Sequence, residues 1–486
     1  MNIKKAALIL SIVGAFIGGA VTSVWADVPQ YYDNFFFWRL GHMDGPHDES
    51  KALGISRDGK VAVGSTLVVD FRRAWRLDID WAISTDDGIP PLYNELQVQE
   101  DIGIVVPSQP SAAYAASNMT TDTCSSYDKV NLSLDWCGSK PVGTLKTGTV
   151  SYAAEWLLPV LDVVDVGDYV TIPDYGGGLA DMRAKDVSTD GLIMVGFGNK
   201  KTGQVAFRAD LTDPLLPIVE ELTITDTLTL QSLQTSSAEA VSVDGLIIAG
   251  YGATKVGNRA FVTTVVDATT APITIESTIL PMLAGGKFAE AYAMTPDGAV
   301  IAGRSGSPLG PQACIWFRVD GNGVFTTALD GTWVVKGLGG LSKSGLDSVA
   351  SGVAYKNDAT WGDLMVVGRS KSILYPSEAF VWAGNPVLVD DGIGYKYDLE
   401  YILIKSGAGT ASTFGSSWIL NEATGISDDG TRIVGWGTNP EQGIEAFAVT
   451  GYPQDIIFFD EGDTGGEPDP KPKPPKDKDD KVNNGH

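Results

Sequence analysis

The stretch Ala423-Thr-Gly-Ile-Ser-Asp-Asp-Gly-Thr-Arg-Ile-Val-Gly435, followed by Ala446-Phe447, is one copy of a pattern that recurs along the chain. In each clear copy a Ser or Thr is followed by Asp-Gly, and a second glycine stands eight residues after that Ser or Thr. The other clear copies begin at Ala52, Ala184, Ala238 and Ala291. Two degenerate copies bring the total to seven: one runs from Ala350 to Ala379-Phe380, and the other is recognised only in its second half, at Val142-Gly143 and Ala153-Ala154.

One copy predicts a four-stranded antiparallel unit. The runs before and after Asp-Gly are short and rich in β-formers, and the glycine supplies the positive φ of a tight hairpin turn. A third strand is predicted at the next apolar run, as in 260–266 and 313–319. A fourth is suggested by segments that end in a glycine turn, at 172–178, 280–286 and 335–340.

The spacing of the copies favours a β-propeller. From Gly143 through Gly196 and Gly250 to Gly303 the intervals are 53, 54 and 53 residues, and they widen to 65, 67 and 79 elsewhere. Periods of this size are typical of propellers and other repeat arrays. We therefore predict an all-β, seven-bladed β-propeller of four-stranded antiparallel blades; the alternative is six blades plus an irregular insertion.

The ends of the chain differ in composition from the repeats. Residues 1–26 combine Lys4 and Lys5 with an apolar run and small residues before Asp27, which is typical of a secretory signal peptide. Residues 460–486 are rich in Pro, Lys and Asp and predict a disordered tail. Between them we expect one propeller domain, 27–459, with an insertion around 78–140 and no membrane span after signal cleavage.

Composition excludes some partners. The formal net charge of -25 disfavours nucleic acid and anionic membranes, and it keeps an exported protein soluble. We expect a secreted, extracellular or cell-surface location, or the periplasm if the cell is Gram-negative and the protein is not exported further.

An aromatic segment precedes the first copy. It contains Tyr31, Phe35, Phe36, Phe37 and Trp38. One interpretation is a strand within this propeller, either in the first blade or closing the ring against the last blade. The other is a partner-binding strand donated to a neighbouring subunit, which would build polymers by strand addition.

Two short segments are candidates for a disulfide and a metal site. Cys124 and Cys137 flank twelve residues, and an oxidising compartment favours a disulfide between them over metal ligation. Asp162, Asp165 and Asp168 alternate in a way that could surround a calcium ion, but an exposed acidic loop is the favoured interpretation of this segment. No other cofactor is expected. Cys314 occupies the Phe position of its repeat and is interpreted as a buried thiol.

Catalytic motifs are scarce. Only His42 and His47 lie in the folded body, which argues against a Ser-His-Asp system, and no G-x-S-x-G or H-E-x-x-H motif is present. The repeated aspartates, one before each turn glycine, are interpreted as turn-formers. They are Asp58, Asp190, Asp244, Asp297 and Asp429.

Tryptophans divide into two groups. Trp75, Trp316 and Trp382 fall in or near the Ala-Phe position and are predicted to pack between blades. Trp333, Trp361 and Trp418 lie in less regular segments, and exposure of these three would support a carbohydrate platform.

The repeats resemble the HAF family of extracellular repeat proteins. The resemblance rests on Leu338-Gly-Gly340 with the copy that ends at Ala379-Phe380, and on the copy from Ala423 to Ala446-Phe447, and it covers roughly residues 40–450. The family's His before Ala-Phe is replaced in this chain by Arg73, Val205, Arg259, Gln312, Glu378 or Glu445. The resemblance implies export and a propeller-like fold, and no chemistry.

These observations lead to one expected function and two alternatives. We expect an extracellular binding or structural module whose partner is a protein or a polysaccharide. The first alternative is a self-associating polymer subunit joined through the aromatic segment. The second is a propeller-type glycan lyase or hydrolase with paired carboxylates in the central channel.

Overall fold

The computed structural model describes the repeat region with several gaps. The described residues are 36–41, 49–68, 71–79, 100–101, 111–116, 141–147, 150–156, 169–171, 179–213, 217–268, 273–341, 347–356, 364–384, 394–405 and 418–451. All of them belong to one compact unit. Within these residues, no helix is both long and apolar enough to cross a membrane.

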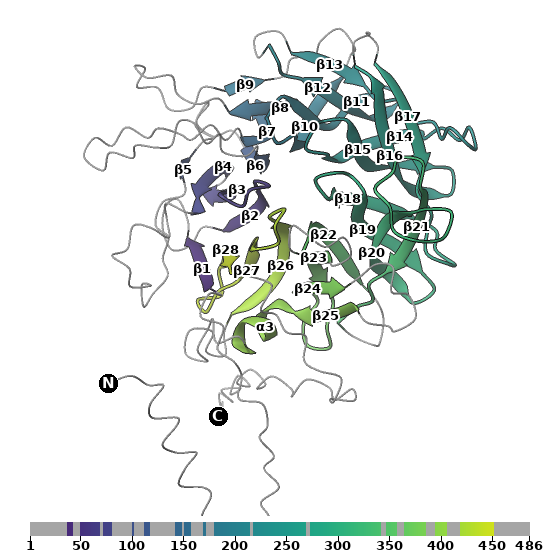
Figure 1. Ribbon diagram of the computed structural model, residues 1–486. Helices are drawn as coiled ribbons and strands as arrows, with labels where there is room; N and C mark the ends of the chain where they lie inside the picture. Colours follow the sequence, from purple (N-terminus) through teal and green to yellow (C-terminus); the bar gives the residue numbers. More distant parts are fainter. Residues whose placement is uncertain are drawn as a thin grey trace, which may run out of the picture. The chain divides into compact units, whose positions relative to one another are not determined.

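The described strands form seven four-stranded antiparallel sheets, which surround a common centre (Figure 1). Each sheet is called a blade, numbered from the amino-terminal end of the chain. The first three blades are blade 1, with β2 (Ser50–Ile55), β3 (Val61–Val68), β4 (Phe71–Asp78) and β5 (Glu100–Asp101); blade 2, with β6 (Ser111–Ala116), β7 (Pro141–Thr147), β8 (Val150–Trp156) and β9 (Tyr169–Thr171); and blade 3, with β10 (Ala180–Val187), β11 (Ile193–Lys200), β12 (Gly203–Asp210) and β13 (Ile218–Glu221).

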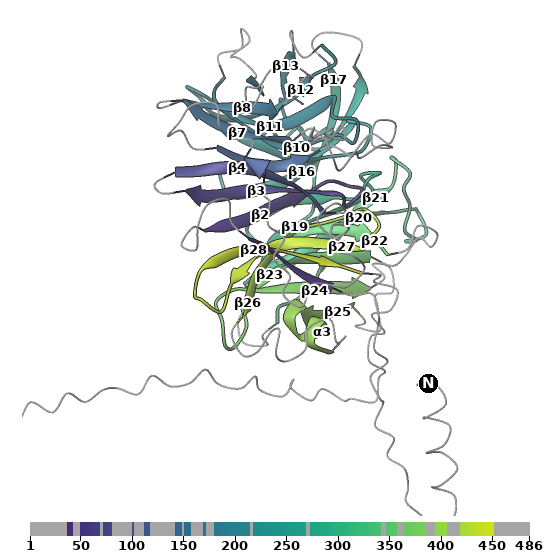
Figure 2. The ribbon, with the colours of Figure 1, turned by 90° about the vertical axis from the view of Figure 1, so that its left-hand side faces the viewer.

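The remaining blades continue the same order. They are blade 4, with β14 (Thr235–Val241), β15 (Ile247–Thr254), β16 (Gly257–Asp267) and β17 (Thr274–Ile279); blade 5, with β18 (Ala289–Met294), β19 (Val300–Ser307), β20 (Gly310–Val319) and β21 (Thr332–Gly337); blade 6, with β22 (Ser348–Tyr355), β23 (Leu364–Ser370), β24 (Glu378–Gly384) and β25 (Gly394–Asp398); and blade 7, with β26 (Ile419–Ile426), β27 (Arg432–Thr438), β28 (Ile444–Thr450) and β1 (Phe36–Gly41). The helix α3 (Leu399–Lys405) follows β25 and contacts β24 and β26; it was not predicted (Figure 2).

The first strand of each blade lies nearest the centre. These inner strands contact one another in succession around the ring, and β26 contacts β2. The predicted propeller of four-stranded antiparallel blades is therefore confirmed as a fold class. The region assigned in the alternative to an irregular insertion supplies β5 and β6.

The hydrophobic core is divided among the contacts between neighbouring blades. Each of the seven core clusters draws its residues from two adjacent blades, as in the cluster of Val195 and Ala206 with Ala238 and Phe261. The Ala and Phe of the repeat are fully buried at these contacts, as are Trp75 and Trp316. Because a single sheet has apolar residues on both faces, it is stable only between two others. Trp382 is 2% exposed, so the prediction that Trp75, Trp316 and Trp382 pack between blades is confirmed.

Blade 7 contains strands from both ends of the repeat region. Its outer strand β1 pairs antiparallel with β28, from Phe36 opposite Thr450 to Gly41 opposite Ala446. The indole Nε1 of Trp38 donates a hydrogen bond to Oγ1 of Thr450 at 2.9 Å. Arg39 binds both carboxylate oxygens of Glu445, at 3.0 and 2.7 Å. The register thus agrees with the ring-closing interpretation of Phe36, Phe37 and Trp38, because β1 forms its ladder with β28 of the same chain.

Two sequence predictions about strands were wrong. The blade 2 copy does possess a first strand, because β6 pairs with β7 and places Ala113 opposite Gly143. That strand was missed because 24 residues, 117–140, replace its Asp-Gly turn. The fourth strand of blade 4 also precedes the predicted segment at 280–286: β17 ends at Ile279, so the glycine turn follows the strand. In blade 2, β9 ends at Thr171, and the predicted segment 172–178 lies outside the described residues. In blade 5, β21 overlaps the predicted segment at 335–337.

Candidate functional site

Each inner strand carries a β-bulge at the same position of the repeat. In blade 1 the pairing of β2 with β3 passes from Ala52 directly to Gly54, so Leu53 has no partner in the ladder. A bulge leaves one residue unpaired and turns its side chain away from the sheet. The seven residues placed in this way are Leu53, Tyr114, Lys185, Glu239, Tyr292, Ser351 and Thr424.

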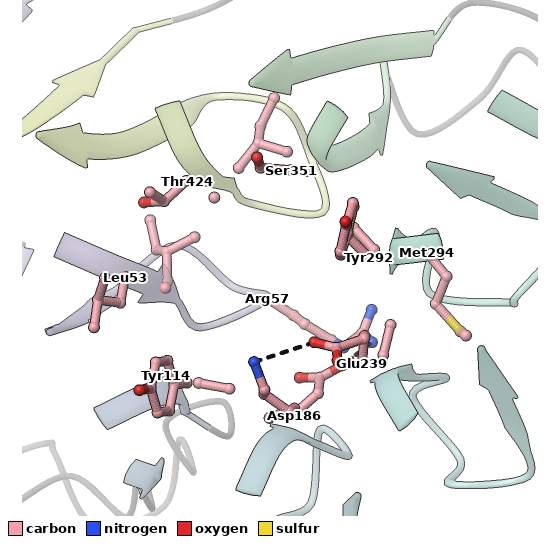
Figure 3. A pocket seen from close by; sticks show the side chains of 18 of the residues that line it. Leu53, Arg57, Tyr114, Asp186, Glu239, Tyr292, Met294, Ser351 and Thr424 are labelled. Carbon is pink, nitrogen blue, oxygen red and sulfur yellow. Dashed lines mark ion pairs between the residues drawn. The ribbon is translucent and has the colours of Figure 1, made fainter. Parts of the chain in front are cut away.

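These seven residues line a cavity on the axis of the ring. Its volume is about 230 Å³, and every blade contributes to its wall. Figure 3 shows the labelled side chains arranged around it, with Leu53 and Tyr114 on one side and Tyr292 and Met294 on the other. We call this cavity the channel pocket and the seven side chains the bulge residues.

The residues on either side of each bulge residue are small for steric reasons. The preceding alanine, such as Ala52 or Ala238, is completely buried. The following residue faces the neighbouring inner strand: a Cβ on Gly54 would lie 2.1 Å from the carbonyl oxygen of Tyr114. This position is glycine or alanine in all blades except blade 3, which has Asp186.

Arg57 crosses one end of the channel pocket. It follows the inner strand of blade 1, and its Nη2 donates a hydrogen bond to the carbonyl oxygen of Val241 in blade 4. Its Nη1 lies 3.4 Å from Oδ1 of Asp428 in blade 7, and its Nη2 lies 3.9 Å from Oδ2 of Asp186 in blade 3. The guanidinium of Arg57 therefore links blade 1 with blades 3, 4 and 7, and Figure 3 shows Arg57 extending across the pocket.

The two carboxyl groups beside Arg57, Asp428 and Asp186, both have raised pKa values. Burial raises the pKa of Asp428 to about 6, although Arg57 opposes this and Asp186 adds to it. Burial likewise raises the pKa of Asp186, against the effect of Arg57 and of hydrogen bonds from the backbone N–H groups of Val241 and Val187. Protonation of either carboxyl group would weaken its ion pair with Arg57.

A second ion pair lies in the wall of the channel pocket. Lys185 Nζ of blade 3 is 3.3 Å from Glu239 Oε2 of blade 4. The other carboxylate oxygen of Glu239 accepts a hydrogen bond from Ser237 Oγ at 2.5 Å. Lys185 Nζ also lies 5.3 Å from the ring centroid of Tyr114, within the range of a cation–π contact.

Tyr292 is fixed by a polar network behind it. Its hydroxyl donates to Glu290 Oε2 at 2.5 Å, and Arg304 Nε donates to the same oxygen at 2.6 Å. Asn258 Nδ2 donates to Glu290 Oε1 at 2.6 Å. Although burial raises the pKa of Glu290, these hydrogen bonds outweigh it and lower the pKa. Glu290 is thus a buried, ionised anchor that holds the Tyr292 ring in place.

A further carboxylate, Glu422, lies beside the bulge residue of blade 6. Ser351 Oγ is 3.4 Å and Arg369 Nε 3.8 Å from Glu422 Oε1. Burial raises the pKa of Glu422 despite these neighbours. The pocket and its surroundings therefore contain several carboxylates, and each of those described here lies beside a cation.

The repeated aspartates have a different role, as predicted. In blade 4, Ser242 Oγ donates to Asp244 Oδ1 at 2.6 Å, and that oxygen accepts the N–H of Leu246 at 3.0 Å. The same hydrogen-bond pair recurs with Asp58, Asp190, Asp297 and Asp429. Each turn glycine has the expected positive φ, as at Gly245 with +72°. These aspartates build hairpins.

Among the other predicted residues, Trp418 is buried at 4% exposure, which contradicts its proposed exposure. It packs edge-on against Phe37 with centroids 5.3 Å apart, because ring closure covers it. Trp333 is partly buried beneath Arg318. Cys314 is fully buried, and burial raises the pKa of its thiol well above the usual value.

Several candidates lie outside the described residues. They are Cys124, Cys137, Asp162, Asp165, Asp168, Tyr31, Phe35 and Trp361. Among the residues that are described, no three His, Cys, Asp or Glu side chains gather in a way that could hold a metal ion.

Sequence reasoning missed the bulge residues. They are the first variable position of the Ala-x-x-Ile-Ser pattern, and their variability was the available signal. Six of the second variable positions are Gly or Ala, whereas the first ranges over apolar, aromatic, hydroxyl and charged types. A position that varies within an otherwise uniform repeat is a candidate for function.

No family model matches this chain, and no curated protein matches it either. Solved structures with similarity to it include TolB from Acinetobacter baumannii, at 12% identity and a TM-score of 0.35, where the match covers 72% of this chain and 63% of the other. Prolyl oligopeptidase B from Galerina marginata has 12% identity and a TM-score of 0.35, covering 62% and 40%. The Dos1 propeller has 7% identity and a TM-score of 0.33, covering 85% and 95%. Similarity at this level gives no information on activity.

Proposed function

We propose that the protein is an exported β-propeller that binds its partner through the channel pocket, at or beyond the cell surface. One observation carries this proposal: the repeat brings seven side chains to one cavity, and six residue types occur among them. A purely structural position would favour one residue type, as the turn position does. The signal-like residues 1–26 and the resemblance to HAF repeats support export, and a periplasmic location is the corresponding proposal for a Gram-negative cell.

The enzyme alternative is less well supported by the geometry. A propeller hydrolase would use two carboxylates with distinct protonation states across an open space. Here Asp186 and Asp428 share Arg57, and Glu239 is paired with Lys185. Both arrangements suit recognition by hydrogen bonds better than proton transfer.

Cell binding tests the proposal. The chain 27–486 is labelled with a fluorophore and titrated onto intact cells of the producing organism. The double variant Lys185→Met/Glu239→Gln removes the ion pair of the channel pocket while keeping similar side-chain volume. The matched control, Lys200→Met/Glu221→Gln, removes an ion pair of the same type in blade 3, between the end of β11 and the outer strand β13.

We expect the channel variant to bind cells at least about tenfold more weakly than the unaltered chain, because a hydrogen bond to a charged group contributes about 1.5–3 kcal/mol. The control variant should bind as the unaltered chain does. Equal binding by all three proteins would contradict the proposal. Circular dichroism and thermal unfolding verify that both variants are folded.

A further inference from the structure

The charged groups of the channel pocket compensate one another. Its wall contains two cations, Arg57 and Lys185, and three carboxylates, Asp186, Glu239 and Asp428. Lys185 lies beside Glu239, and Arg57 lies between the other two, whose pKa values are raised by burial. In a chain with a net charge of -25, the lining of this pocket is close to neutral.

Because these charges are already paired, the channel pocket favours neutral ligands over charged ones. A ligand carboxylate or ammonium would have to compete for one member of an ion pair and leave the other uncompensated in a partly buried site, which is costly. A neutral ligand with adjacent hydroxyl groups meets no such cost. One hydroxyl can donate to the Glu239 carboxylate while the next accepts from Lys185 Nζ, and the ion pair stays intact.

Aromatic rings complete the site. Tyr114 and Tyr292 both line the channel pocket, as Figure 3 shows. The Tyr292 hydroxyl is engaged by Glu290, and the Tyr251 ring contacts the Tyr292 ring at a centroid distance of 5.9 Å and an angle of 69°. The Tyr292 ring is thereby held rigidly beside the channel pocket. An amphipathic ligand with apolar C–H groups and polar hydroxyls suits a wall of this composition.

The shape of the channel pocket limits how much ligand it can hold. Arg57 crosses the axis from blade 1 to blade 4, so a polymer cannot pass through at that end. The volume of about 230 Å³ lies below the roughly 300–1,000 Å³ of pockets that enclose a drug-sized molecule. A single ring at the end of a chain fits these limits.

We infer that the channel pocket binds the terminal, uncharged sugar of a glycan, with Lys185 and Glu239 hydrogen-bonding neighbouring hydroxyls and Tyr114 and Tyr292 contacting the ring. This inference rests on the proposed function and names its ligand. The partner is recognised by its chain end, and the interior of a linear polysaccharide is not bound.

The test is a binding assay with defined probes. The chain 27–486 is titrated by calorimetry with oligosaccharides whose non-reducing end is glucose, galactose, mannose or N-acetylglucosamine. Two matched series replace this end by a uronate or by the same sugar with methylated hydroxyls. A panel of short peptides with free termini is included. We expect binding of at least one neutral series, and at least about tenfold weaker binding of its uronate and methylated counterparts.

Variants connect this binding to the pocket. Lys185→Met/Glu239→Gln and Tyr292→Ala should each lower the affinity for the neutral end at least about tenfold, whereas Lys200→Met/Glu221→Gln should not change it. Tyr292→Phe keeps the ring and should lose less than Tyr292→Ala. Preference for uronate or peptide probes, binding to no neutral probe, or unchanged binding by the channel variant would each overturn the inference.

Failure of the inference can be distinguished from failure of the proposed function. If cell binding depends on Lys185 and Glu239 but no neutral sugar binds, the protein is a binding module with another ligand class. If cell binding is indifferent to these two residues, the proposed function itself is wrong.

Discussion

The first two strands of each blade contain one position that is nearly constant and one that varies. At one end the turn, Ser or Thr followed by x-Asp-Gly, is nearly the same in five blades, and its Ser or Thr hydroxyl donates a hydrogen bond to its Asp, as Ser242 does to Asp244. A few residues away the bulge residue differs from blade to blade and lines the channel pocket. The positions that are uniform among the blades stabilise the hairpin, and the position that varies faces the channel pocket. Four substitutions test this contrast, beginning with the largest expected effect.

Gly250→Ala should be the most destabilising change. A Cβ at this position would lie 2.0 Å from the carbonyl oxygen of Ser237, so β14 and β15 would have to separate. We expect a loss of about 3 kcal/mol in the free energy of unfolding, measured by urea denaturation. Gly321→Ala is the control, because a Cβ there meets nothing within 4 Å. Equal losses in both variants would show that the close approach is unimportant.

Ser242→Ala should be the next most destabilising. The Ser242 hydroxyl donates to Asp244 and accepts the N–H of Ile247 at 2.9 Å, so its loss leaves a buried donor unpaired. We expect a loss of about 2 kcal/mol by urea denaturation. Ser242→Thr keeps the hydroxyl, as blade 5 does with Thr295, and should lose less than half as much. If the two variants are equally unstable, packing and not the hydrogen bonds explains the repeat's preference.

Asp428→Asn should reduce the dependence of stability on pH. The pKa of Asp428 is raised from 3.8 to about 6, chiefly by burial, so between these values the folded chain binds more protons than the unfolded chain. Stability from this group is therefore present at low pH and is lost as pH rises through about 6.

The measurement compares the free energy of unfolding at pH 5.0 and pH 7.5. We expect the decrease between them to be smaller by about 1 kcal/mol in Asp428→Asn than in Asp330→Asn. Asp330 is exposed, so the control changes the net charge equally without altering the channel pocket. An identical decrease in both variants would refute the coupling of Asp428 to stability.

Ser351→Ala, at a bulge residue, should have the smallest effect. Among the described residues, its hydroxyl makes one long contact, 3.4 Å from Glu422, and the residue has no partner in the ladder. We expect a change within about 0.5 kcal/mol by urea denaturation. A loss comparable to that of Ser242→Ala would mean that the bulge residues are structural, and the contrast between the two ends would fail.

Much of the blade was predictable because it is encoded locally. Asp-Gly fixes a turn, and alternating β-formers on either side fix two strands, as in β14 and β15. Prediction failed where pairing is not local. β6 was missed because 24 residues separate it from β7. The fourth strand of blade 4 was misplaced because a glycine turn marks the end of a strand without marking its start. Trp418 was misjudged because its cover, Phe37, is supplied by the other end of the chain.

The candidate site was less predictable than the blade. Nothing in the order of residues places Lys185 beside Glu239, or Arg57 against Val241, because these contacts join different blades. The sequence alone determined the turn chemistry, which depends on residues close together in the chain, and the propeller class, which follows from the regular spacing of the repeat copies. Tertiary structure decided which variable positions face the axis, since only closure of the ring brings seven separate bulges together in one pocket.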